Sequence, residues 1–149
     1  IVEQFGAQRV IATDVDPEQI ERAKKNLKSG FKDKIEFRVA DSMALDEPDG
    51  KFDAVFSFGV IHHMEDWRKA VKEISRVLKS GGEFFFEEPL REFTSIFTKG
   101  SMLSMIATHP TGGMFSFDEF KDELKNNNVD IINIKHFGNI AIFGVGRKR

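Results

Sequence analysis

Two aspartates stand where short apolar stretches of the sequence end. Asp14 closes the stretch at residues 9–14, and Asp41 follows the alternating stretch at residues 35–39. In an open parallel sheet, ligands bind beyond the carboxyl ends of the strands. A carboxylate there can accept two hydrogen bonds from a ribose diol. The alternative for Asp14 is an acid at a helix entry, but Asp16 already fills that role. The ribose of a nicotinamide dinucleotide can be bound by a carboxylate at the same position. Asp14 alone therefore does not identify the ligand.

A third apolar stretch, residues 54–58, leads through Phe58 and Gly59 to the adjacent pair His62 and His63. An imidazole can take a proton from a nucleophile near neutral pH. The alternative is that the pair only shapes the site. We expect no metal here, because neighbouring side chains diverge and no Asp or Glu constellation completes a ligand set.

Glu87 and Glu88 follow the phenylalanine-rich stretch at residues 84–86. If that stretch is a strand, both carboxylates reach the same rim as the histidines. One of them could orient an acceptor amine or hydroxyl, and a solvated rim is the alternative.

The spacing of apolar residues predicts strands that alternate with helices. Asp16 caps a helix that starts at Pro17 and ends at Gly30, and the segment from Trp67 keeps helical spacing until Gly81-Gly82 stops it. This alternation is the α/β signature. Near the end of the chain, the pattern predicts a capping box at residues 116–119, a helix stopped by three asparagines, and a closing antiparallel hairpin around Gly138-Asn139.

The stretch from Pro89 to Phe115 breaks this alternation. Serine, threonine, glycine and methionine mix there with scattered apolar residues, and no period emerges. We expect residues 89–115 to form a lid or an insertion that faces the substrate.

Several of these motifs occur in an order that resembles a known family. They are residues 11–17, the Val-Ala-Asp at 39–41, residues 52–63, and the Lys-Ser-Gly-Gly-Glu at 79–83. Their order resembles the class I S-adenosylmethionine-dependent methyltransferases, nearest to the small-molecule and quinone-biosynthesis members. The resemblance implies a Rossmann-like, doubly wound, mostly parallel sheet with a C-terminal antiparallel hairpin. It also implies S-adenosylmethionine as cofactor and methyl transfer to a small-molecule acceptor.

The resemblance gives several residues a role toward the cofactor. Asp14 would bind the ribose, Val15 would lie under the adenine ring, and Asp41 with Ser42 would receive the adenine amino group. The backbone at Phe58 and Gly59 would face the methionine amino group, since glycine permits close approach. Val15 could instead be core. His62 and His63 are the catalytic candidates.

One departure from the family pattern affects the expected completeness of the chain. No glycine-rich loop of the G-x-G type precedes Asp14, although the family has such a loop after its first strand. We therefore expect residues 1–149 to be an N-terminally incomplete methyltransferase domain, with two strand edges left unpaired and prone to self-association. The alternatives are a non-catalytic remnant or binding module with this fold and, more weakly, a nicotinamide oxidoreductase.

Composition narrows the partners and the location. The formal net charge is -2, which gives no whole-chain attraction to nucleic acid or to anionic lipid. The sequence has no cysteine, so thiolate metal sites and cysteine nucleophiles are excluded. No signal-peptide pattern or membrane-length apolar run is present, and we expect a cytoplasmic protein without membrane or nucleic-acid partners.

Overall fold

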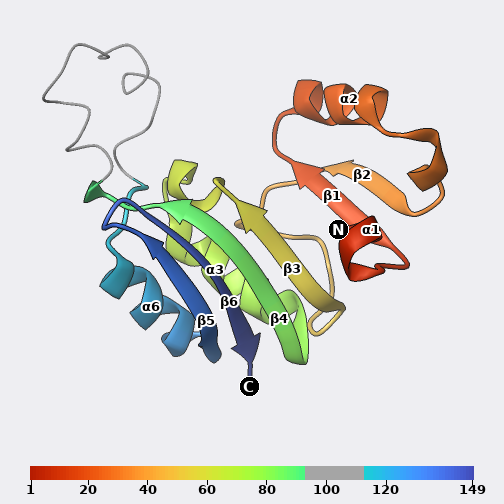
Figure 1. The fold of residues 1–149 in the computed structure, drawn as a ribbon. Helices are drawn as coiled ribbons and strands as arrows, with labels where there is room; N and C mark the ends of the chain where they lie inside the picture. The colour runs from red at the N-terminus through yellow and green to blue at the C-terminus, as the bar shows by residue number, and fades with distance from the viewer. Residues whose placement is uncertain (93–112) are drawn as a thin grey trace, which may run out of the picture. The chain divides into compact units, whose positions relative to one another are not determined.

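A computed structural model of the chain describes residues 1–92 and 113–149. The chain divides into two compact units, residues 1–46 and residues 47–149. Each unit has its own hydrogen-bonded sheet (Figure 1). The α/β class predicted from the alternation of patterns is confirmed.

The first unit is a parallel strand pair with a helix between its strands in sequence. Its elements are α1 (Val2–Phe5), β1 (Val10–Asp14), α2 (Pro17–Asn26), the 3-10 turn η1 (Ser29–Phe31) and β2 (Ile35–Val39). β1 and β2 are parallel, and their register places Asp14 opposite Val39. The carboxyl ends of both strands therefore lie at one edge of this small sheet.

The start of α2 follows from its first two residues, as predicted. The Asp16 carboxylate accepts a 2.8 Å hydrogen bond from the backbone N–H of Glu18, and Pro17 at the first helical position needs no N–H partner. The helix ends at Asn26, earlier than the predicted stop at Gly30. The chain then turns through η1, and its backbone leaves the α region at Leu27.

The second unit contains a four-stranded sheet in the order β3-β4-β6-β5. β3 and β4 are parallel, whereas β6 is antiparallel to both β4 and β5. The predicted C-terminal hairpin is present, and its second strand inserts beside β4. The elements are β3 (Phe52–Phe58), the 3-10 turn η2 (Ile61–His63), α3 (Trp67–Val77), β4 (Leu78–Pro89), α6 (Phe117–Asn126), β5 (Val129–Phe137) and β6 (Ala141–Lys148).

The junction between α3 and β4 differs from the prediction. We predicted that Gly81-Gly82 would stop the helix, but α3 ends at Val77 and β4 begins at Leu78. Leu78 pairs with Phe52, and the next pair joins Glu83 to Ala54, so the two glycines lie in an irregularity of the ladder. The reason is that Leu78 is fully buried and pairs at once with the sheet, leaving the glycines to take up the extra length.

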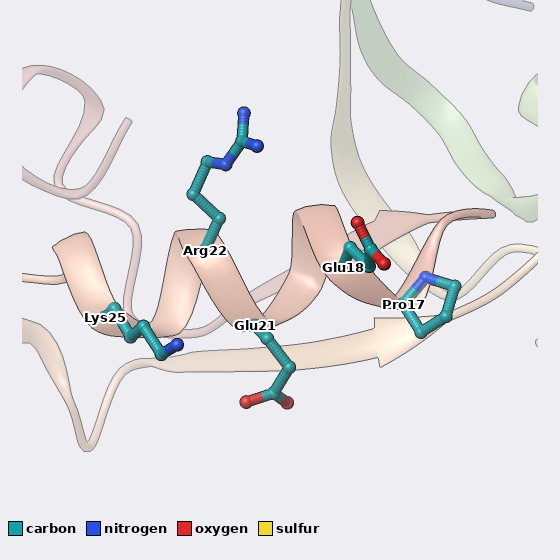
Figure 2. Close-up of a pocket in the computed structure, with 5 residues that line it drawn as sticks. All are labelled: Pro17, Glu18, Glu21, Arg22 and Lys25. Carbon is teal, nitrogen blue, oxygen red and sulfur yellow. The ribbon is translucent and has the colours of Figure 1, made fainter.

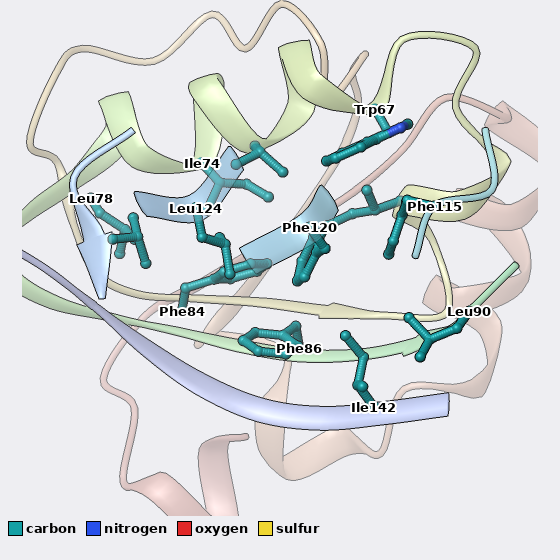
Figure 3. Packing of buried hydrophobic residues seen from close by; sticks show 13 residues of the cluster. Trp67, Ile74, Leu78, Phe84, Phe86, Leu90, Phe115, Phe120, Leu124 and Ile142 are labelled. Carbon is teal, nitrogen blue, oxygen red and sulfur yellow. The ribbon is translucent and has the colours of Figure 1, made fainter. Parts of the chain in front are cut away.

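The core of the second unit lies between the sheet and the helices α3 and α6 (Figure 3). Trp67 packs on Phe115 with ring centroids 4.7 Å apart, and Phe115 stacks on Phe120 at 4.8 Å. Such aromatic contacts add to the free energy gained by burial alone. The core side chains with almost no exposure are Ile61, Val71, Leu78, Phe84, Phe86, Phe115, Phe120, Leu124, Val129 and Ile142.

The predicted capping box fixes the start of α6. The Ser116 hydroxyl accepts a hydrogen bond from the Glu119 N–H, and the Glu119 carboxylate accepts one from the Ser116 N–H at 2.8 Å. The helix ends at Asn126, and Asn128 has a positive φ of 61°. The expected stop at the three asparagines is confirmed.

The structure bears on two further expectations, the unpaired strand edges and the lid at residues 89–115. Within residues 1–92 and 113–149, β1 pairs only with β2 and β3 pairs only with β4, so each has one edge without a strand partner. The proposed lid at 89–115 falls mostly on residues 93–112, which lie outside the described residues. Its flanks belong to the scaffold, because Leu90 and Phe115 are buried in the core.

Candidate functional site

The first group of predicted residues lies at the carboxyl ends of β1 and β2. Asp14 is the last residue of β1, and the chain after Val39 is tied to it by a 3.0 Å bond from the Ala40 N–H to the Asp14 carbonyl. Asp41 therefore follows β2 at the same edge as Asp14. The register of the parallel pair brings the two carboxylates to one end of the sheet, as their positions in the sequence predicted.

Both aspartates use one carboxylate oxygen to shape their own loop. Asp14 Oδ1 accepts a 2.9 Å bond from the Asp16 N–H, and Asp41 Oδ1 accepts a 2.8 Å bond from the Met43 N–H. These are local turns across two residues, typical of aspartate. A carboxylate has about four acceptor sites, so one backbone bond leaves capacity for a ligand.

Val15 lies beside Asp14 with 71% of its side chain exposed. The alternative that Val15 belongs to the core is therefore wrong. Ser42 is half-buried next to Asp41. An exposed β-branched side chain next to Asp14 is a surface on which a flat ring could lie, and the assignment to adenine stays a prediction.

The second group lies at the end of β3 in the other unit. Phe58 is the last residue of β3 and is 54% exposed, and Gly59 follows with a φ of +65°. The Gly59 N–H donates to the Glu87 carbonyl at 2.6 Å, which continues the sheet past the strand end. Residues with a side chain rarely adopt this φ, so Gly59 sets the sharp turn that leads to the histidines.

Glu88 is the centre of this turn. Its side chain is fully buried, so the solvated rim considered for it is wrong. Oε1 accepts bonds from the N–H groups of Ile61 at 3.0 Å and Val60 at 3.2 Å, with the Ser57 hydroxyl at 3.4 Å. Oε2 accepts from the His62 N–H at 3.3 Å and contacts His62 Nδ1 at 2.8 Å. Alternation along β4 explains the burial, since Phe84, Phe86 and Glu88 share one face.

The two histidines differ in their surroundings. His62 is 4% exposed and its ring is held by Glu88, whereas His63 is exposed. The expectation that their side chains diverge is wrong, because the ring centroids lie 4.0 Å apart with a tilt of 39°. Within the part of the chain that the structure describes, no group of three or more His, Cys, Asp or Glu side chains is arranged to hold a metal ion.

A second contact fixes the histidine turn from another side. Gly113 packs so closely on it that a Cβ there would lie 2.5 Å from the His62 carbonyl oxygen and 2.4 Å from that of Met64. Real Cβ atoms do not approach backbone oxygens so closely. Neither the packing of Gly113 nor the role of Glu88 was predicted. These two residues lie 51 and 26 positions from His62 in the sequence. The one signal for Glu88 was its place in the strand alternation, two residues after Phe86.

The surface also has two hollows. One, of about 450 Å³, lies along α2 and is lined by Pro17, Glu18, Glu21, Arg22 and Lys25 (Figure 2). Its charged side chains are those of an exposed helix face, and it contains no predicted site residue. The other, of about 270 Å³, is lined in part by Leu90, Phe117 and His136. The candidate residues therefore form two groups, one at the carboxyl ends of β1 and β2 in the first unit and one at the end of β3 in the second.

Comparison with known proteins finds sequence similarity to methyltransferases. The chain is 35% identical over 74 residues to a 27-O-demethylrifamycin SV methyltransferase from Amycolatopsis mediterranei, covering 49% of this chain and 27% of the relative. It is 37% identical over 86 residues to a 2-methyl-6-phytyl-1,4-hydroquinone methyltransferase from a Synechocystis species, covering 52% and 26%. The matched region thus spans about a quarter of these relatives' length.

The fold has solved counterparts. The structure of a geranyl diphosphate methyltransferase in complex with S-adenosylmethionine superposes with a TM-score of 0.75 at 14% identity, covering 99% of this chain and 71% of that one. At this identity the likeness concerns the fold alone. The methyltransferase domain family matches residues 1–86, more than half of the chain. The chain therefore belongs to the methyltransferase domain family, as its motifs predicted.

Proposed function

We propose that the protein transfers a methyl group from S-adenosylmethionine to a small-molecule acceptor. The observation that carries the proposal is the family match over residues 1–86. All eight predicted site residues lie inside that range: Asp14, Val15, Asp41, Ser42, Phe58, Gly59, His62 and His63. The printed activities of the two relatives, methylation of a rifamycin precursor and of a hydroquinone, support a small-molecule acceptor.

The residues at the end of β1 and β2 fit the nucleoside part of this cofactor. The Asp14 carboxylate has acceptor capacity beyond its bond to the Asp16 N–H, as binding of a ribose diol needs. Val15 offers an exposed apolar surface, and Asp41 could accept a bond from an exocyclic amine. In unit 2, the backbone at Phe58 and Gly59 would meet the amino-acid part of the cofactor.

The sulfonium of the bound cofactor supplies an already activated methyl group. The chain therefore needs only to align the acceptor and exclude water. One of the two histidines could also receive the proton that an acceptor hydroxyl or amine loses. The segment 89–115 would face the acceptor. These assignments are proposals for mutagenesis.

Calorimetry with three ligands tests the proposal. The native-length protein should bind S-adenosylmethionine and S-adenosylhomocysteine and should not bind NAD. Transfer of a labelled methyl group to a panel of phenols, hydroquinones and secondary amines should then identify the acceptor class. NAD binding without S-adenosylhomocysteine binding would favour an oxidoreductase, and binding without transfer to any acceptor would favour a non-catalytic binding module.

Partners and location belong to the proposal as well. The described residues contain no helix that is both long and apolar enough to span a bilayer. We propose a cytoplasmic enzyme without nucleic-acid or membrane partners, and we expect the 149-residue chain to self-associate through the open edges of β1 and β3. Light scattering should then give a mass that rises with concentration. A constant monomer mass would contradict the self-association.

A further inference from the structure

Glu88 and His62 form a buried pair that joins the carboxyl end of β4 to the turn η2, which follows β3. The Glu88 carboxylate is fully buried and His62 is 4% exposed. The pair is separated by 26 residues in sequence and by 2.8 Å in space, between Oε2 and Nδ1. A buried carboxylate is costly unless hydrogen bonds compensate it, and here donors surround both oxygens.

The donors determine what each group of the pair does. Three of them are the backbone N–H groups of Val60, Ile61 and His62. An ionised carboxylate is an acceptor only, so its contact with His62 requires that Nδ1 carry a hydrogen. The pair thereby fixes both the path of the backbone after Gly59 and the protonated nitrogen of the His62 ring.

We propose that Glu88 is a positioning residue, and that His62 acts with it through its Nδ1–H to hold the turn that follows Gly59. The inference rests on the proposed function, because this turn carries the residues expected to meet the cofactor and the acceptor. His63 is exposed, and its ring centroid lies 4.0 Å from that of His62 at a tilt of 39°. It is then the imidazole that faces the acceptor.

Substitutions at His62 separate positioning from proton transfer. The side-chain N–H₂ of His62→Asn lies where Nδ1 lies, so this variant keeps the donor to Glu88 and lacks the second ring nitrogen. His62→Leu removes both. We expect kcat/KM for S-adenosylmethionine to be about tenfold or more lower in His62→Leu than in His62→Asn, the factor for a hydrogen bond to a charged group. If His62→Asn is as inactive as His62→Leu, the remainder of the ring acts in catalysis and the proposal is wrong.

A substitution at Glu88 tests the same pair from its other side. Glu88→Gln keeps the shape of the side chain. Its carbonyl oxygen can accept the hydrogen bonds from the Val60 and Ile61 N–H groups. Its N–H₂ then faces His62, so Nδ1 should lose its hydrogen and become an acceptor. We expect about a tenfold rise in the Kd for S-adenosylhomocysteine. The matched control is Glu83→Gln on the same strand, whose exposed ion pair with Arg147 at 2.6 Å should matter by less than about twofold.

Nuclear magnetic resonance gives a readout that does not depend on activity. Long-range proton–nitrogen correlation spectra of the native-length protein should show His62 Nδ1 protonated in the wild type and unprotonated in Glu88→Gln. An unprotonated Nδ1 in the wild type would overturn the proposal even if every variant failed to fold. If the wild type neither binds S-adenosylhomocysteine nor transfers methyl groups, the proposed function fails. The protonation state of Nδ1 would still decide whether the Glu88–His62 pair exists.

Discussion

Asp14 in the first unit and Glu88 in the second both lie at parallel strand pairs, but their carboxylates have opposite surroundings. Asp14 is half-buried and accepts a bond from the N–H two residues later. Glu88 is fully buried and accepts bonds from residues 26 to 31 positions away. The first carboxylate belongs to a local turn beside solvent, whereas the second belongs to the core. A substitution should therefore affect ligand binding at Asp14 and stability at Glu88.

The largest effect should come from Glu88→Ala. This change leaves the N–H groups of Ile61 and His62 and the Nδ1–H of His62 buried without an acceptor, and each such group costs about 1–3 kcal/mol. We expect a fall of that size in the free energy of unfolding, measured by urea titration of the native-length protein. A loss below about 1 kcal/mol would mean that water replaces the carboxylate.

The next effect concerns binding at Asp14. Asp14→Ala should weaken S-adenosylhomocysteine binding by about 1.5–3 kcal/mol, the scale for a hydrogen bond to a charged group, with little change in unfolding free energy. Asp14→Asn keeps an oxygen for the Asp16 N–H and is the variant that isolates the charge. Asp33→Ala removes an exposed carboxylate elsewhere in the same unit and serves as the control. Unchanged affinity on calorimetry would remove Asp14 from the site.

The same contrast explains which parts of the molecule the sequence could predict. Local signals worked: Asp16 caps α2, Ser116 opens α6 with a capping box, and the turn at Gly138 joins two antiparallel strands. Each depends on residues within about four positions, where backbone geometry leaves few choices. Asp14 and Asp41 reached one edge for a similar reason, because strand register decides it.

Contacts between distant residues could not be read in this way. Glu88 was expected at the rim, either orienting an acceptor or solvated, because nothing near it in sequence indicates the donors from residues 57–62 that surround it. The histidine rings were expected to diverge, but the turn η2 and the bond to Glu88 bring them together. Gly81-Gly82 were predicted to stop the helix, but burial of Leu78 ended it first. In each case tertiary packing overrode the local pattern.

Gly113→Ala is a smaller test of the packed turn. The new methyl group would lie 2.4–2.5 Å from the carbonyl oxygens of Met64 and His62, and the backbone has to shift. Overpacking of this kind costs about 1–3 kcal/mol, and we expect this loss in urea unfolding. Gly30→Ala is the matched control, since no atom lies within 4 Å of its Cβ position and its φ is not in the left-handed region. Equal stability of both variants would show that the turn yields easily.

The smallest effect should come from an exposed carboxylate in the first unit. Hydrogen bonds from Arg38 and then Arg9 lower the pKa of Glu36 from 4.5 to about 2, at 2.6 and 2.7 Å. Because the folded pKa is below the unfolded one, the stabilisation is present above pH 4.5 and is lost as the pH falls toward 2. A carboxyl titration by nuclear magnetic resonance should give the low pKa, and salt should raise it because surface pairs are screened. Arg38→Ala should raise it more than Arg9→Ala. If neither variant raises the pKa of Glu36, its ion pairs at the surface do not persist in solution. The difference in stabilisation between this exposed carboxylate and the buried Glu88 is then larger still.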